Sequence, residues 1–187
     1  MGAWGYGIKE NDAAMDMMND FESIVSYDSN YGRQHPQYHD LPFPKKITCV
    51  IDELIAHCRD SEEEGHFRAV GFQALACLIM EQGSAVTPMQ WRTISDECVQ
   101  CPEYQLAQEL SHQGKGVISS QAMLEHGFED DMWGIEAHQK RLEGRLNAIN
   151  HFIELMNNYP VKGGHVQSIE HMGLIEAMTQ AQHKPKF

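Results

Sequence analysis

Apolar side chains recur at intervals of three and four residues along most of this chain, and this spacing constrains the fold more than any other feature. The clearest run is Ile47, Val50, Ile51, Leu54, Ile55 and Cys58. In an α-helix these positions lie on one face, which can be buried against other helices. No segment shows the alternation typical of a half-buried strand. The sequence therefore predicts an all-α fold, a single-domain bundle of about six to eight helices.

The expected helices are mostly separated by glycine or proline. They cover residues 13–25, 47–58, 67–80, 89–99, 103–111, 119–125, 132–157 and 166–180. The segment 67–80 is apolar nearly all round, interrupted mainly by Arg68 and Gln73, so we expect it at the centre of the bundle. Its small residues, including Gly71, would let neighbouring helices approach closely.

Residues 26–46 are expected to form a long loop between the first two helices. This segment is rich in turn-forming residues and ends in Leu-Pro-Phe-Pro at residues 41–44. Proline disfavours both helix interiors and central strands, which argues against regular structure here.

We expect one helical domain over residues 1–160 and a C-terminal helical extension with a basic tail over residues 161–187. A chain of 187 residues with 42% hydrophobic residues can bury a substantial core. It shows neither an apolar stretch of membrane-spanning length nor the pattern of a secretory signal. We therefore expect a cytoplasmic protein that does not bind membranes, with its five cysteines reduced.

Three glycines surround two large aromatic residues at the N-terminus, directly before the first expected helix. Gly2, Gly5 and Gly7 permit unusual backbone angles or close approach, and Trp4 offers a large area for burial. Asn11 is a suitable helix-capping residue. These residues predict a structural motif in which the N-terminal segment docks onto the helical core. The glycines do not form a phosphate-binding loop, because no strand precedes them and no Lys-Ser/Thr pair follows.

This opening resembles that of an uncharacterised bacterial family of small acidic helical proteins, a domain of unknown function. Members begin Met-Gly-Ala-Trp-Gly-x-Gly and continue with Asn-Asp-x-Ala-x-Asp, which the chain matches at residues 1–7 and 11–16. It departs at Tyr6, where a small residue is usual, and at Lys9 and Glu10. The likeness covers the first 25 residues strongly and extends loosely to about residue 150. The resemblance implies a mostly helical cytoplasmic domain, with no agreed activity or catalytic residue.

The chain is strongly acidic, with a formal net charge of −13. The charge is uneven, at −5 over residues 1–30 and −6 over residues 61–114. Direct nucleic-acid binding is disfavoured because it needs a basic surface, whereas a basic protein partner is compatible with this charge.

Carboxylates recur every four residues in the first expected helix, at Asp12, Asp16 and Asp20. This spacing places them along one helical face, where they repel one another unless a base or cation matches them. We predict that these three residues, with Glu62 and Glu63, bind a partner. A solvated helix face is the simpler interpretation.

Two residue groups are weak candidates for metal binding. His35, His39 and Asp40 lie close together in the expected loop, and Cys98 and Cys101 have the spacing of a zinc knuckle. Structural zinc usually has four ligands, and no second matched cysteine pair is present. Incidental loop histidines and partly buried thiols are therefore the simpler interpretation.

His138 lies near the apolar stripe of the long helix 132–157. We expect it to be a hydrogen-bonded core residue rather than a ligand or a base.

No catalytic constellation or cofactor motif is recognised in the sequence. We therefore expect a non-enzymatic, acidic, protein-binding protein, such as an inhibitor or immunity protein that neutralises a basic toxin or nucleic-acid-binding protein. A DNA mimic would be a special case of this function. The alternative is a metal-dependent hydrolase that uses the His35/His39/Asp40 loop and the Asp12/Asp16/Asp20 face.

Overall fold

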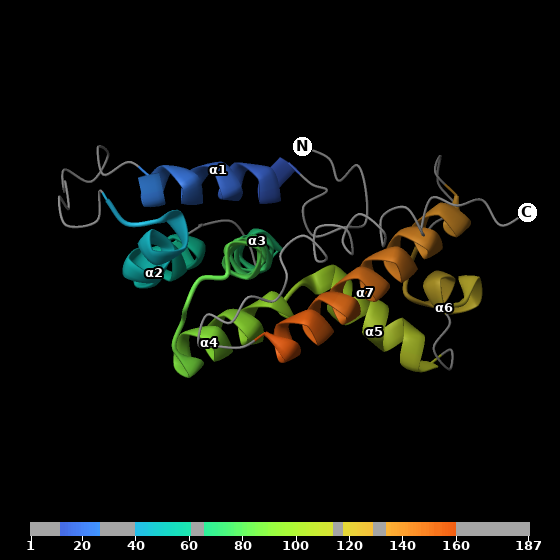
Figure 1. Ribbon diagram of the computed structural model, residues 1–187. Helices are drawn as coiled ribbons and strands as arrows, with labels where there is room; N and C mark the ends of the chain where they lie inside the picture. The colour runs from blue at the N-terminus through green and yellow to red at the C-terminus, as the bar shows by residue number, and fades with distance from the viewer. Residues whose placement is uncertain (1–11, 27–39, 61–65, 114–117, 129–133, 160–187) are drawn as a thin grey trace, which may run out of the picture.

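The computed structural model describes residues 12–26, 40–60, 66–113, 118–128 and 134–159, and in these ranges the protein is all α-helical. Seven helices and no strand occur there, as the apolar spacing predicted (Figure 1). The helices are α1 (Asp12–Ser26), α2 (Phe43–Asp60), α3 (His66–Gln82), α4 (Pro88–Cys98), α5 (Pro102–Gln113), α6 (Ser120–Glu125) and α7 (Ile135–Asn158).

Helix α3 lies at the centre, and α1, α2 and α4 pack against it (Figure 1). Every residue from Ala69 to Met80 is buried, because neighbouring helices surround this segment. A Cβ added to Gly71 would lie 2.9 Å from the terminal methyl of Met17 in α1 and 3.6 Å from the sulfur of Cys58 in α2. The missing side chain at Gly71 therefore permits the close approach of three helices, which confirms the predicted role of this helix.

Helices α1 and α2 each bury one apolar face, and in α2 it is the predicted one. In α1 Ala14, Phe21 and Val25 are buried, while Met17 packs partly buried against the core. In α2 all six residues of the predicted stripe are buried, namely Ile47, Val50, Ile51, Leu54, Ile55 and Cys58.

Helix α7 packs against α5 and α6. Hydrogen bonds also join its C-terminal end to α4 and α3. The indole Nε1 of Trp91 donates a hydrogen bond to the carbonyl oxygen of Met156 at 3.1 Å. The hydroxyl of Tyr159 lies 2.8 Å from the carbonyl oxygen of Ser84 and 3.1 Å from that of Ile79. The rings of Trp91 and Tyr159 also meet, with their centroids 4.9 Å apart. These contacts join the C-terminal end of α7 to α3 and α4.

The start of α2 differs from the prediction, because residues 43–46 are helical rather than part of a loop. Pro44 falls in the first turn, where the missing N–H would have no partner within the helix in any case. The carbonyl oxygen of Pro42 accepts hydrogen bonds from the amides of Lys45 and Lys46, which begins the helix. The prediction was wrong here because it took the prolines of residues 41–44 as helix breakers, although Pro44 stands in a first turn.

Other helix ends follow local sequence signals. Thr87 caps α4 through a reciprocal capping box with Gln90, and Gly83 ends the preceding helix with a φ of 64°. Helix α7 begins at Ile135, because Gly134 has a φ of 74° and cannot continue a right-handed helix. The predicted start at residue 132, the docked N-terminal motif of Gly2, Trp4, Gly5, Gly7 and Asn11, and the helix 166–180 lie outside the described residues.

None of the helices in the described ranges is both long and apolar enough to cross a membrane.

Candidate partner-binding surface

Helix α1 carries four carboxylates and no basic residue. We define the α1 acidic face as Asp12, Asp16, Asp20 and Glu22. Asp16, Asp20 and Glu22 are exposed and Asp12 is half-buried, because the opposite side of the helix is packed on the core. Glu22 was not among the predicted residues, because it falls outside the four-residue spacing, although it also points away from the core.

The three aspartates do not form a straight line along α1. Residues four apart advance by about 40° round an α-helix, so Asp20 is rotated about 80° from Asp12. This rotation brings Asp20 to the margin of the exposed face, beside α2. The four-residue spacing predicted that the three aspartates lie on one side of the helix. It did not indicate that Asp20 is rotated toward α2.

Asp20 meets His57 of α2. Its Oδ2 lies 3.1 Å from Nε2 of His57, and the side chains are 56% and 30% exposed. The His57 ring also contacts Phe21 edge-on, with the ring centroids 6.1 Å apart. His57 is thus a base that faces one of the three aspartates. It lies 37 residues from Asp20, and no local sequence pattern indicates this pairing.

An exposed apolar side chain lies within this surface. Met15 is 43% exposed and directly precedes Asp16, so the outer side of α1 combines carboxylates with one flexible thioether. Methionine adapts its shape readily to a partner, which suits a contact surface.

The structure describes only some of the predicted site residues that lie outside α1. Asp40 is exposed in the turn before α2. Glu62, Glu63, His35 and His39 lie outside the described residues, so their predicted roles stay predictions.

Cys98 and Cys101 are both fully buried, at the end of α4 and just before α5. Burial raises the pKa of Cys98 well above its ordinary value, with nearby Cys77, Cys58 and Glu97 adding to the effect. Burial likewise raises the pKa of Cys58. Burial therefore disfavours the thiolate form of Cys98 and Cys58, which is the form that a nucleophile needs. Within the described ranges no three His, Cys, Asp or Glu side chains lie together as metal ligands would.

His138 is half-buried rather than a core residue. Its ring packs against Phe128, with the centroids 5.7 Å apart. The prediction placed it in the core because it lies next to the apolar stripe of α7, but its position is at the edge of that stripe.

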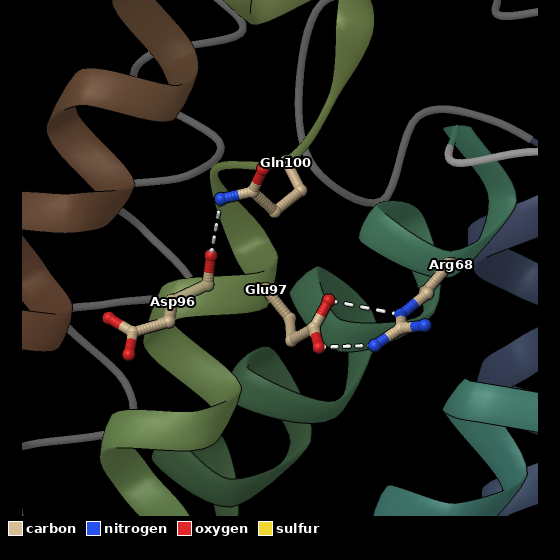
Figure 2. Close-up of polar contacts among 4 residues, drawn as sticks. All are labelled: Arg68, Asp96, Glu97 and Gln100. Atoms are coloured by element: carbon tan, nitrogen blue, oxygen red, sulfur yellow. Dashed lines mark hydrogen bonds and ion pairs between the residues drawn. The ribbon is translucent and has the colours of Figure 1, made fainter.

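Other charged side chains are used to join helices. Figure 2 shows Arg68 of α3 donating hydrogen bonds to both carboxylate oxygens of Glu97 in α4. Nε of Arg68 lies 3.0 Å from Oε2 of Glu97. The hydrogen bond that Arg68 donates to Glu97 raises the pKa of Arg68 above its ordinary value. In the same view the side chain of Gln100 donates to the carbonyl oxygen of Asp96 at 3.3 Å. Glu97 is therefore engaged in a contact between helices α3 and α4.

Comparisons of the chain with protein-family models, with curated proteins and with solved structures gave no match, which is consistent with its resemblance to an uncharacterised family.

Proposed function

We propose that the protein binds a basic protein through the α1 acidic face and acts as an inhibitor or immunity protein. The observation that supports this most is the charge of α1, which carries four acidic residues and no basic one. Three of the four side chains are exposed to solvent.

Electrostatic complementarity explains why such a face suits a basic partner. Clustered carboxylates speed diffusional encounter with a positive surface and disfavour acidic competitors. The exposed Met15 adds an apolar contact within the charged surface. The rigid attachment of α1 through Phe21 and Val25 holds these groups in place before binding, which lowers the entropic cost of association.

Affinity capture with matched variants tests the proposal. The wild type, an α1 variant (Asp16→Asn, Asp20→Asn, Glu22→Gln) and a control variant (Glu109→Gln, Glu125→Gln, Glu136→Gln) would be immobilised and exposed to extract of the native host. Both variants lose three negative charges, but the control residues are exposed on α5, α6 and α7.

At moderate salt the wild type and the control variant should retain a basic protein that the α1 variant loses. If no basic protein is retained, or if all three retain it equally, the proposed function is wrong.

A further inference from the structure

We propose that His57 is a pH-dependent internal counterion of the α1 acidic face, which binds Asp20 more strongly when protonated and thereby weakens the face for a basic partner. The consequence for the partner rests on the proposed function, whereas the contact itself can be tested without any partner. The inference starts from the distance of 3.1 Å between Nε2 of His57 and Oδ2 of Asp20.

The geometry allows this contact in both charge states of the ring. A neutral imidazole with its proton on Nε2 donates a hydrogen bond to the carboxylate, and a protonated ring adds a full opposite charge. Histidine is the side chain that ordinarily changes charge between pH 8 and 5, where aspartate is ionised. The partial exposure of both side chains leaves them accessible to protons and to a competing cation.

The charged groups around His57 favour a cation there. From α1 it faces Asp20, with Asp16 one turn away, and no base is present on that helix. On α2 itself, Glu53 lies one turn before it and Asp60 nearly one turn after, with Arg59 two residues on.

Helix α3, which also packs on α2, has two charged side chains among those described. They are Arg68, which is held by Glu97 of α4, and Glu81, which lies at the far end of the helix. The Arg68 charge is thereby balanced, so the described surroundings of His57 are acidic.

The sign of the effect follows from this arrangement. Nε2 of His57 lies 3.1 Å from a carboxylate oxygen of Asp20, so a proton on the ring adds a charge–charge attraction between α1 and α2 that the neutral ring lacks. A protonated His57 also neutralises one charge of the α1 acidic face. The same proton should therefore strengthen the attachment of α1 to α2 and weaken the binding of a cationic partner.

A double-mutant cycle tests the contact directly. The thermal midpoint of unfolding would be measured at pH 8 and pH 5.5 for the wild type, Asp20→Asn, His57→Gln and the double variant. We expect Asp20→Asn to lower the midpoint more at pH 5.5 than at pH 8, and this difference to vanish when His57 is Gln. A pH-independent coupling between the two positions would overturn the proposal.

Binding of an octalysine peptide at the same two pH values tests the consequence. Affinity should fall from pH 8 to pH 5.5 by roughly two- to fivefold more in the wild type than in His57→Gln. His126→Gln, which removes an exposed histidine at the end of α6, should behave as the wild type. An equal fall in the wild type and His57→Gln overturns the inference, while peptide binding unaffected by the α1 variant at pH 8 contradicts the proposed function instead.

Discussion

Gln73 of α3 joins two other helices in the protein interior by using both ends of its amide. Its Nε2 donates a hydrogen bond to the carbonyl oxygen of Cys98 at 2.7 Å, and its Oε1 accepts one from Arg145 of α7 at 2.9 Å. Gln73 is fully buried and Arg145 is only 6% exposed. This contact links the centre of the bundle to the long helix through polar groups that water does not reach.

Replacing Gln73 with Met should therefore lower the free energy of unfolding by about 2–4 kcal/mol, because a carbonyl and a buried guanidinium each lose a partner while the volume is nearly kept. Urea unfolding measures this loss. The same substitution at Gln105, which is exposed on α5, should change stability by less than about 0.5 kcal/mol. Equal effects at the two positions would show that the buried contact contributes little.

Gly71 should tolerate Ala but not Leu. Alanine is the better helix former by about 0.5–1 kcal/mol, and the methyl of Met17 that it would meet is the end of a flexible side chain. We expect Gly71→Ala to remain within about 0.5 kcal/mol of the wild type. Gly71→Leu should lose about 1–3 kcal/mol, since the longer side chain also runs into Cys58. Similar unfolding midpoints for the two variants would contradict the close packing of α1, α2 and α3.

The helices themselves could be predicted from the sequence, because each amphipathic face is a local pattern of residues three and four apart. The buried face of α2 and the central place of α3 were both confirmed. The start of α2 was missed because the same residue, proline, breaks a helix interior but suits a first turn.

Contacts between distant residues could not be predicted from local patterns. The sequence marks Gln73 and Arg68 only as interruptions of an apolar helix, and their partners Arg145 and Glu97 lie 72 and 29 residues away. The same holds for His57 and Asp20. These long-range pairs decide which charged residues remain available to a partner. The sequence could therefore identify candidate acidic residues, but only the fold shows which of them are paired within the protein.

Thiol labelling should distinguish one cysteine from the other four. Cys49 is exposed on α2, whereas Cys58, Cys77, Cys98 and Cys101 are buried. In native protein one thiol should react with an aromatic disulfide reagent at least ~100-fold faster than the others, because the buried thiols become accessible only when the fold opens. Cys49→Ser should abolish the fast phase. A second fast thiol in that variant would contradict the packing around α3.

Tyr159 should make the protein sensitive to alkaline pH. Burial raises the pKa of its hydroxyl to about 12, whereas a tyrosine in the unfolded chain ionises near ~10. The unfolded state therefore loses the proton first, so this part of the stability is complete below about pH 10 and is lost as pH rises toward the folded value.

Between pH 9 and 11.5 the unfolding midpoint of the wild type should thus fall more steeply than that of Tyr159→Phe. At pH 7 this variant should be less stable by about 1 kcal/mol, because the carbonyl oxygen of Ser84 loses the tyrosine donor and that of Ile79 keeps only the amide of Ser84. Parallel profiles over the alkaline range would contradict the burial of Tyr159 between α3 and α4.

Chemical-shift mapping with the octalysine peptide at pH 8 tests most directly whether the α1 acidic face is the contact surface. In a titration of isotope-labelled protein, the largest amide shifts should fall within residues 12–26 and on His57, and they should disappear in the α1 variant but persist in the control variant. Shifts spread evenly over the exposed acids of α5, α6 and α7, or unchanged in the α1 variant, would contradict the account.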